Sequence, residues 1–352
     1  MSKYVNVGGV LIGNSNPISI QSMINVPLLN TKEAIAQINE LEMAGCEIVR
    51  AAVNDEKNAN ALKEVLANIN LPFVADIHFD YRLAIKAIEA GVHKLRINPG
   101  NIGGKDKLRV VCDYLKEYKI PVRIGINAGS LEKDLLLKYG HPTPEALVES
   151  AKRSIDYFNE FGYDDIVVSI KSSDVVSTYQ ANILFAKLYD YPIHLGITES
   201  GSEMTGVVRS SVGIGAMLLG GVGDTLRVSL TGEPVQEIYA AKEILSACNL
   251  RSEGVRVISC PTCGRTRTDI VPIIREVKEK TKDIKVPINI AIMGCVVNGP
   301  GEAKEADLGI ACGVDSAVLF VGGERIKKIN AVEMVDVLVE EIKSIEKKKV
   351  EV

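Results

Sequence analysis

Between residue 18 and about residue 250, the chain repeats one pattern: a short apolar run ending in polar residues, then a longer segment with apolar residues at helical spacing. The apolar runs predict strands at residues 18–22, 47–53, 72–78, 94–98, 122–127, 165–172, 192–199 and 224–229. The longer segments predict helices at residues 31–44, 58–69, 81–90, 105–118, 144–161, 175–189, 204–219 and 234–248. Pro144 in a first turn, and Gly45 and Gly91 after last turns, support these boundaries.

Eight strand–helix repeats in about 250 residues match the size of a (β/α)8 barrel, and we expect a TIM barrel over residues 1–251. An open doubly wound sheet is the alternative. Such a sheet usually has fewer strands and often a glycine-rich dinucleotide turn after the first one, which residues 19–26 lack.

After Leu250 the pattern changes. Apolar runs predict strands at residues 255–260, 288–293, 308–311 and 317–321, and helical spacing predicts helices at residues 269–280 and 331–347. We therefore expect a second, smaller α+β domain over residues 252–352.

Polar residues end the predicted barrel strands, and in a barrel these ends meet at one face, where active sites lie. They are Arg50, Asp76, His78, Arg96, Asn98, Arg123, Asn127, Lys171, Ser172, Thr198, Glu199, Arg227 and Ser229. A single arginine after a strand is most often part of a surface salt bridge. Five cations at equivalent positions would repel one another unless a polyanion lay among them, so the pattern predicts a ligand with more than one phosphate.

Three of the polar side chains allow more specific expectations. His78 at a strand end is a candidate for contact with a phosphate or hydroxyl group. Glu199, among the cations, is a candidate for acid–base chemistry or for binding a substrate hydroxyl. His194 begins an apolar run, and we expect it to be a hydrogen-bonded core residue.

The second domain contains a candidate metal site. Cys260 and Cys263 form a close thiol pair, Cys295 follows 32 positions later, and Glu302 comes seven positions after that. Pro261 and Gly264 predict a bend in the first segment, and Gly299, Pro300 and Gly301 predict one in the second. Each thiol would then lie on a turn, where backbone N–H groups can bond to sulfur. An iron–sulfur cluster is one interpretation. A structural zinc site, with Cys312 as a possible fourth thiolate, and a disulfide or unreactive thiols are the others.

Composition narrows the class of protein. The chain has 352 residues, 46% hydrophobic and 24% charged, which is ordinary for a globular protein. A net charge of −4 gives no sign of nucleic-acid binding. Seven unevenly spaced cysteines do not form a secreted disulfide framework, and we find neither a signal peptide nor a run long enough to cross a membrane. We expect a cytoplasmic protein.

Several motifs together resemble those of the 4-hydroxy-3-methylbut-2-enyl diphosphate synthases of the non-mevalonate isoprenoid pathway, in their two-domain bacterial form. They are Ser-Cys-Pro-Thr-Cys-Gly-Arg at residues 259–265, Met-Gly-Cys-Val-Val-Asn-Gly-Pro-Gly-Glu-Ala at 293–303, Val-Arg at 49–50, Ala-Asp-Ile-His-Phe at 75–79, Arg-Ile-Asn-Pro-Gly at 96–100 and Leu-Gly-Ile-Thr-Glu at 195–199. The resemblance covers nearly the whole chain. One departure is the run Ile24-Asn25-Val26-Pro27, where the family usually has a Thr-Asn-Thr type of sequence.

The resemblance implies a TIM barrel followed by a domain like that of sulfite and nitrite reductases, with a [4Fe–4S] cluster on Cys260, Cys263, Cys295 and Glu302. It implies that 2-C-methyl-D-erythritol 2,4-cyclodiphosphate is reduced by two electrons, with loss of a hydroxyl group as water. The residues expected to bind the diphosphate or the rest of the substrate are Arg50, His78, Arg96, Asn98, Arg123, Asn127, Lys171, Thr198, Arg227 and Ser229, with Glu199 handling the proton of the departing hydroxyl.

The family also leads us to expect flavodoxin or ferredoxin as electron donor. A head-to-tail homodimer is expected too, in which one subunit's cluster domain covers the other subunit's barrel. The alternative function is that of a phosphate-binding barrel aldolase or pterin-type transferase whose second domain holds structural zinc.

Overall fold

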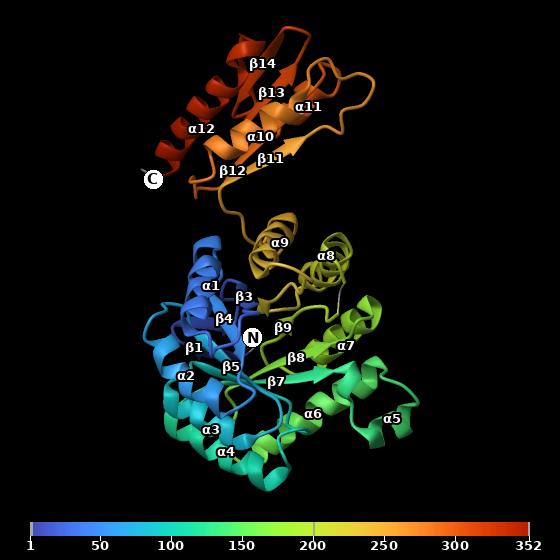
Figure 1. Ribbon diagram of the computed structural model, residues 1–352. Coiled ribbons are helices and arrows are strands. Elements are labelled where there is room, and N and C mark those ends of the chain that lie inside the picture. Colours follow the sequence, from blue (N-terminus) through green and yellow to red (C-terminus); the bar gives the residue numbers. More distant parts are fainter. Residues whose placement is uncertain (1–2, 200, 351–352) are drawn as a thin grey trace. The chain divides into compact units, whose positions relative to one another are not determined.

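The computed structural model describes residues 3–199 and 201–350, and its internal contacts divide the chain into two units, Met1–Arg251 and Ser252–Val352 (Figure 1). None of the helices within the described ranges is long and apolar enough to cross a membrane.

Parallel strands form an eight-stranded sheet in the first unit, in the order β8-β7-β6-β5-β4-β3-β10-β9. An isolated parallel bridge between Val168 and Ile193 joins the two ends of this order, so the sheet closes into a barrel. The strands are β3 (Ser19–Met23), β4 (Ile48–Ala52), β5 (Phe73–Ile77), β6 (Lys94–Ile97), β7 (Val122–Asn127), β8 (Ile166–Lys171), β9 (His194–Leu195) and β10 (Thr225–Leu226). The barrel prediction is confirmed.

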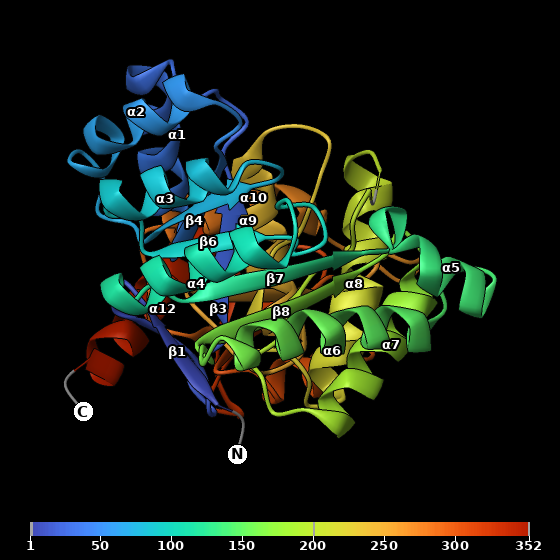
Figure 2. The same ribbon diagram turned by 90° about the horizontal axis from the view of Figure 1, so that it is seen from below.

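Helices lie outside the barrel strands, and their apolar faces build the main core against the outer face of the sheet (Figures 1 and 2). They are α1 (Thr31–Ala44), α2 (Glu56–Leu66), α3 (Tyr81–Ala90), α4 (Lys105–Tyr118), η1 (Ala128–Ser130), α5 (Lys133–Tyr139), α6 (Pro144–Glu160), α7 (Val175–Leu188), α8 (Glu203–Leu219) and α9 (Pro234–Ala247). The alternation of strand and helix therefore covers the expected segments, while η1 and α5 were not predicted.

Two barrel strands are shorter than the sequence pattern suggests. The pattern predicts strands at residues 192–199 and 224–229, whereas β9 and β10 each contain two residues. Beyond them, the Arg227 backbone N–H still donates to the Leu195 carbonyl at 3.0 Å. At Gly196 the two segments come so close that a Cβ would lie 2.7 Å from the Arg227 carbonyl oxygen.

A hairpin that the sequence analysis did not predict closes the amino-terminal end of the barrel. It consists of β1 (Tyr4–Val7) and β2 (Val10–Gly13), joined through Gly8 and Gly9, which both have positive φ. The hairpin side chains Val5, Val7 and Ile12 pack against Ile48, Val74 and Val167 of the barrel strands. This apolar cluster seals one end of the barrel.

The second unit has a five-stranded sheet in the order β11-β12-β13-β14-β15. The first three of these strands are parallel, and the last two pair antiparallel. Its elements are β11 (Val255–Ser259), α10 (Ile270–Lys280), β12 (Ile288–Met293), α11 (Gly299–Lys304), β13 (Leu308–Cys312), β14 (Ser316–Val321), β15 (Glu324–Asn330), η2 (Ala331–Glu333) and α12 (Met334–Val350). This confirms the expected α+β class.

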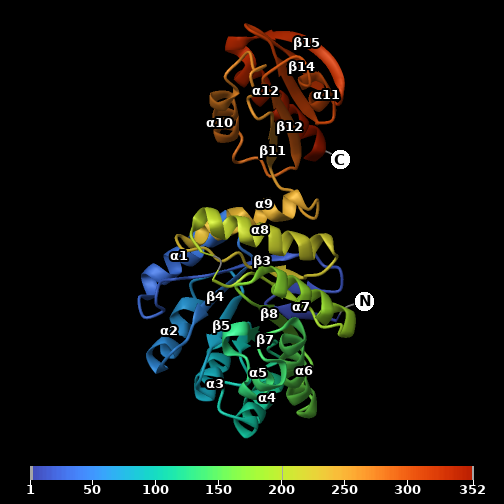
Figure 3. The same cartoon turned by 90° about the vertical axis from the view of Figure 1, so that its right-hand side faces the viewer.

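Alternating residues of these strands supply two cores. Ile288, Ile290 and Ile292 face α10 and α12, whereas Ala291 and Met293 face α11 on the other side of the sheet (Figure 3). The sequence predicts a bend at residues 299–301 and no helix, whereas the structure begins α11 there. Proline is compatible with a first helical turn, so Gly-Pro-Gly does not prevent a helix at this position.

Candidate functional site in the barrel and the thiol turns

The strand register gathers charged residues inside the barrel. Asp76, Arg96 and Arg123 are neighbours in one row across β5, β6 and β7. One inward-facing position earlier on its strand, Lys94 lies in a row with Val74 and Arg50. Because every second residue of a strand points to the same face, these side chains share the barrel interior.

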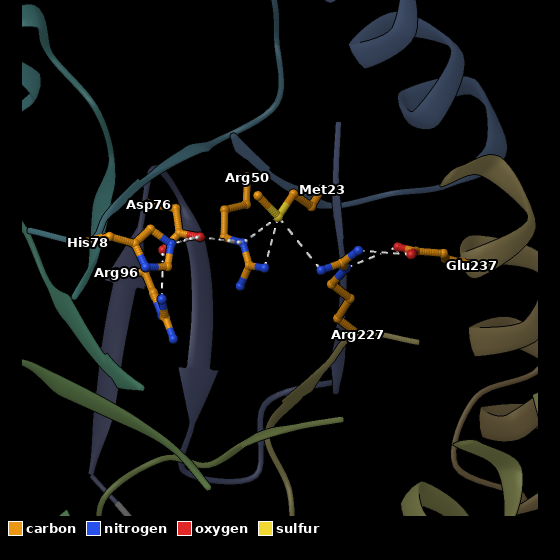
Figure 4. Close-up of polar contacts among 7 residues, drawn as sticks. All are labelled: Met23, Arg50, Asp76, His78, Arg96, Arg227 and Glu237. Atoms are coloured by element: carbon orange, nitrogen blue, oxygen red, sulfur yellow. Dashed lines mark hydrogen bonds and ion pairs between the residues drawn. The ribbon is translucent and has the colours of Figure 1, made fainter. Parts of the chain in front are cut away.

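Asp76 is the centre of one ion network (Figure 4). Its carboxylate lies 3.1 Å from Arg96 Nη1, 3.7 Å from Arg50 Nε and 3.3 Å from His78 Nε2. Burial opposes ionisation of this carboxyl group, but Arg50, His78 and Arg96 together hold its pKa below the usual value. Asp76 therefore stays ionised and fixes the two arginines in place.

A second carboxylate, Glu237 of α9, holds Arg227 in a bidentate pair with N–O distances of 3.0 and 2.9 Å. The Ser22 hydroxyl also donates to Glu237, at 2.8 Å. Between the two networks lies the Met23 sulfur, which accepts from Arg50 Nη2 at 2.9 Å and from Arg227 Nη1 at 3.7 Å (Figure 4). A neutral thioether thus orients two guanidinium groups without cancelling their charge.

Three further cations of the barrel have no ion-pair partner among the described residues: Lys94, Arg123 and Lys171. The Nζ atom of Lys94, and Nε and Nη1 of Arg123, are buried and make no hydrogen bond there either. Burial, followed by the charges of Arg123 and Arg50, lowers the pKa of both Lys94 and Lys171. An anion placed among these groups would accept hydrogen bonds from the unpaired nitrogens, and its negative charge would offset the repulsion among the buried cations.

Two glycines make room for these side chains. A Cβ on Gly125 of β7 would lie 2.6 Å from Nε and Nη2 of Arg96. A Cβ on Gly196 would collide with Lys171 Nζ. The absence of a side chain at these two inward-facing positions lets the long cations extend across the barrel.

The remaining predicted side chains lie at the carboxyl-terminal end of the barrel strands. Asn127 ends β7, and its amide oxygen accepts from Arg96 Nη2 at 3.2 Å when the amide is oriented to satisfy both groups. Asn98 is buried and accepts from the Gly100 backbone N–H at 3.1 Å. Thr198 and Ser229 are half-buried in the loops after β9 and β10.

Glu199 has a different setting from the other predicted residues. It is exposed, and its backbone lies in the left-handed region with φ of 52°. For a residue with a Cβ this conformation is strained, and such strain gathers at functional sites. Glu199 follows Gly196 and Thr198 in the segment after β9, so it lies at the open, carboxyl-terminal end of the barrel.

Sequence reasoning missed several participants. Lys94 stands two positions before Arg96, so period-two spacing alone could have placed it on the inward face. Met23 and Glu237 gave no such signal, because their roles depend on contacts between distant elements. His194 is fully buried, as expected. The prediction that it is hydrogen-bonded is wrong, because neither ring nitrogen has a hydrogen-bond partner in the described ranges.

The thiol residues lie on turns of the second unit. The Gly294 backbone N–H donates to the Cys260 sulfur at 3.3 Å. The backbone N–H of Arg265, and then its guanidinium group, lower the pKa of Cys263. Backbone N–H groups after Cys295, first that of Asn298, lower the pKa of Cys295, and Arg265 adds to this effect. The lowered pKa values of Cys263 and Cys295 favour the thiolate, which is the form that binds metal.

Cys312 differs from these three cysteines. It is fully buried in the core of the second unit, 3.9 Å from the Met334 sulfur, and burial raises its pKa to about 11. The four histidines of the sequence all precede this unit. The donors available on the turns are thus three thiols, with Glu302 exposed on α11. Over residues 3–199 and 201–350, no three His, Cys, Asp or Glu side chains are already arranged to hold a metal ion.

Fold and site together define a class of two-domain proteins: a closed β/α barrel with buried arginines and lysines inside it, followed by an α+β domain with thiols on its turns. Within that class, residues 2–242 match the model of the GcpE TIM-barrel domain, and residues 256–344 match that of the GcpE protein C-terminal domain. The chain belongs to the GcpE family, which confirms the resemblance seen in its motifs.

Relatives of similar length support this membership. A protein of Thermodesulfovibrio yellowstonii is 52% identical over 97% of this chain and 98% of its own length, and one of Clostridium perfringens is 50% identical over 98% and 99%. Both are named 4-hydroxy-3-methylbut-2-en-1-yl diphosphate synthase (flavodoxin).

Solved structures resemble the chain in fold alone. Dihydropteroate synthase of Yersinia pestis aligns with a TM-score of 0.52 at 13% identity, over 71% of this chain and all of that one. N-acetylneuraminic acid synthetase of Leptospira borgpetersenii aligns with a TM-score of 0.51 at 12% identity, over 80% of this chain and 97% of that one. At such identities the likeness supports the barrel and carries no argument for a pterin-type or aldolase activity.

Proposed function

We propose that this chain catalyses the reductive ring opening and dehydroxylation of 2-C-methyl-D-erythritol 2,4-cyclodiphosphate to 4-hydroxy-3-methylbut-2-enyl diphosphate, a step of the non-mevalonate isoprenoid pathway. Two electrons and two protons enter, the bond between the ring oxygen and carbon breaks, and one hydroxyl leaves as water. The full-length relatives support this assignment, since they are named for this activity at about half identity.

The observation that carries the proposal is the excess of positive charge inside the barrel. Six basic side chains lie there, namely Arg50, Lys94, Arg96, Arg123, Lys171 and Arg227, and the carboxylates paired with them are Asp76 and Glu237. A cyclic diphosphate brings two negative charges and several acceptor oxygens. Arginine forks match these oxygens well, and a buried site makes the attraction strong.

The residues of the barrel then have distinct tasks. The arginines and Lys171 bind the diphosphate, helped by the amides of Asn98 and Asn127 and the hydroxyls of Thr198 and Ser229. His78, hydrogen-bonded to Asp76, is placed to contact a phosphate or hydroxyl oxygen. Glu199, at the exposed mouth, handles the proton of the departing hydroxyl.

The donor set of the second unit fits a [4Fe–4S] cluster better than zinc. Cys260, Cys263, Cys295 and Glu302 would hold the cluster, with three thiolates supported by backbone N–H groups and one weaker oxygen ligand. Structural zinc usually takes four Cys or His ligands, and Cys312 is occupied with core packing. When bound, such a cluster would supply the two electrons one at a time. This makes residues 252–352 the cluster domain and residues 1–251 the substrate-binding domain.

Flavodoxin is the electron donor that we propose, because the relatives carry it in their names. We further propose a head-to-tail homodimer in the cytoplasm, in which a barrel and a cluster domain from different subunits form one active site. The barrel cations and the thiols lie in separate units of the chain, which supports an arrangement of this kind.

The test is turnover and colour of protein purified without oxygen. With flavodoxin and its reductase, the brown protein should convert the cyclodiphosphate, and Cys263→Ser should lose both the visible absorbance and turnover. Cys248→Ser, a half-buried cysteine of the barrel unit, is the matched control and should keep both. Arg123→Ala should keep the absorbance but bind substrate at least tenfold more weakly. Colourless protein that contains zinc would support the alternative activity instead.

A further inference from the structure

Lys94 occupies a position that the binding of diphosphate by the arginines does not explain. It is the first residue of β6 and is fully buried, and its Nζ atom has no hydrogen-bond partner in the described ranges. Its neighbour in the strand register is Val74, which belongs to the apolar cluster under the barrel. Lys94 therefore lies deeper in the barrel than Arg96, on the side that the β1–β2 hairpin closes.

The charged groups around Lys94 are mostly positive. Arg123 on β7 and Arg50 on β4 both act on it, and it acts in turn on His194 of β9. The nearest carboxylate in the strand rows, Asp76 of β5, is already shared by Arg50, Arg96 and His78. A guanidinium group keeps its proton at any physiological pH, so Lys94, Lys171 and His194, whose pKa values are all lowered by burial and by the neighbouring cations, are the groups that can relieve the crowding by giving protons up. Lys94 differs from Lys171 because it lies at the start of its strand, below the residues expected to bind the diphosphate.

We propose that Lys94 is a positioning residue for the diphosphate: uncharged while only the arginines surround it, it takes up a proton when the diphosphate enters the barrel. The proposal rests on the function proposed above. Two negative charges entering above Arg123 reverse the local field, and the protonated amine then attracts the diphosphate from below. The ordering of the arginines by Asp76, Met23 and Glu237 stays as it is (Figure 4).

The cyclic diphosphate makes this proton exchange measurable. Each phosphorus in the ring has a single, strongly acidic oxygen, so the free ligand does not titrate near neutral pH. Protons taken up on binding must therefore go to the protein. Because the bound state holds the extra proton, affinity should fall as pH rises, and log Kd should rise by about one per pH unit between the free and bound pKa values of Lys94.

The experiment is calorimetric titration of the oxidised holoenzyme with the cyclodiphosphate, without reductant, in buffers that differ in ionisation enthalpy. We expect uptake of about one proton per site near pH 7.5. Lys94→Met should abolish the uptake and weaken binding about tenfold at pH 7, the equivalent of one pKa unit. Lys94→Arg, charged in both states, should also bind without uptake. Lys133→Met, an exposed lysine of α5, should behave like the wild type.

A second readout separates this role from a merely structural one. Without bound ligand, the Lys94→Met variant should melt at a higher temperature than the wild type, because it replaces a buried unpaired amine with an apolar chain of similar length. If Lys94 served only to stabilise the fold, Lys94→Met should have both a lower melting temperature and a lower affinity for the cyclodiphosphate. Binding without proton uptake in the wild type, or uptake that persists in Lys94→Met, would overturn the proposal while leaving the function intact. Loss of that remaining uptake in His194→Gln or in Lys171→Met would then identify the group that takes up the proton instead. Failure of the cyclodiphosphate to bind at all would instead remove the proposed function.

Discussion

Charged side chains inside the barrel are arranged by neighbours that do not themselves bind phosphate. Asp76 fixes Arg50 and Arg96, Glu237 fixes Arg227, and the Met23 thioether lies between two of these guanidinium groups. Groups held in place before the ligand arrives lose little freedom on binding, so the same contacts give higher affinity. The carboxylates reduce the repulsion among the cations but leave an excess of positive charge for the ligand.

Gly125 tests this ordering at a single residue. In Gly125→Ala the new methyl group would lie 2.6 Å from the Arg96 guanidinium, which must move away from Asp76 and Asn127. We expect about tenfold weaker substrate binding, because one charge-assisted contact is lost. Isothermal titration with the cyclodiphosphate measures the change. Gly129→Ala, where the new methyl group meets no atom within 4 Å, is the control. Equal affinities in the two variants would mean that the position of Arg96 does not matter for binding.

Among the secondary-structure elements, the β1–β2 hairpin decides which end of the barrel is open. Its apolar side chains cover Ile48, Val74 and Val167 at the amino-terminal ends of the strands. The deepest polar residues, including Lys94 and His194, are thereby separated from solvent on that side. The ligand must enter from the carboxyl-terminal end, where the loops carry Thr198, Glu199 and Ser229.

Truncation of Ile12 should show that the hairpin contributes to stability and not to binding. Ile12 is fully buried, so Ile12→Ala should lower the free energy of unfolding by about 3 kcal/mol through lost burial and a cavity. Leu11, the preceding residue of the strand, is 39% exposed, and Leu11→Ala should cost less than about 1 kcal/mol. Urea denaturation of both variants measures the difference. Substrate affinity should stay at the wild-type value in each, and a loss in Ile12→Ala alone would connect the hairpin to the site.

At the scale of the whole molecule, the two units have separate hydrophobic cores and separate chemical groups. The cations belong to the unit Met1–Arg251 and the thiols to the unit Ser252–Val352. The proposed reaction would require a barrel and a cluster domain to meet. A head-to-tail dimer would bring them together between subunits. Complementation between two variants with different defects can test this arrangement.

Mixing two defective variants distinguishes the arrangements, provided that turnover is measured at a substrate concentration too low to occupy the Arg123→Ala barrel. Arg123→Ala damages the barrel and Cys263→Ser the thiol site, so in a head-to-tail heterodimer one undamaged barrel faces one undamaged cluster domain. After random exchange of subunits, half of the dimers are mixed and each has one working site, giving about a quarter of the wild-type activity per subunit. Mixing Cys263→Ser with Cys260→Ser should restore none. If proven heterodimers of the first pair stay inactive, each barrel works with its own chain's cluster domain.

Much of this protein is determined by local sequence. Alternating apolar runs and amphipathic segments specify the barrel and the α+β class, because hydrophobic periodicity records which faces are buried. That Arg50, Arg96 and Arg123 lie on barrel strands follows from the same pattern. Their expected place at the strand ends does not hold throughout, because Arg50 is in the middle of β4 and Arg123 is the second residue of β7. The spacing and turn residues around Cys260 and Cys295 likewise mark the thiol site without any knowledge of distant contacts.

Only the tertiary structure decided how these residues act on one another. The pairing of Arg227 with Glu237 of α9, the sulfur of Met23 between two arginines, and the sealing of the barrel by a short amino-terminal hairpin join elements far apart in the chain. The charge state of Lys94 also depends on burial and on neighbours from other strands. Electrostatic interactions act through space, so their strength is fixed by distances that a linear pattern does not contain.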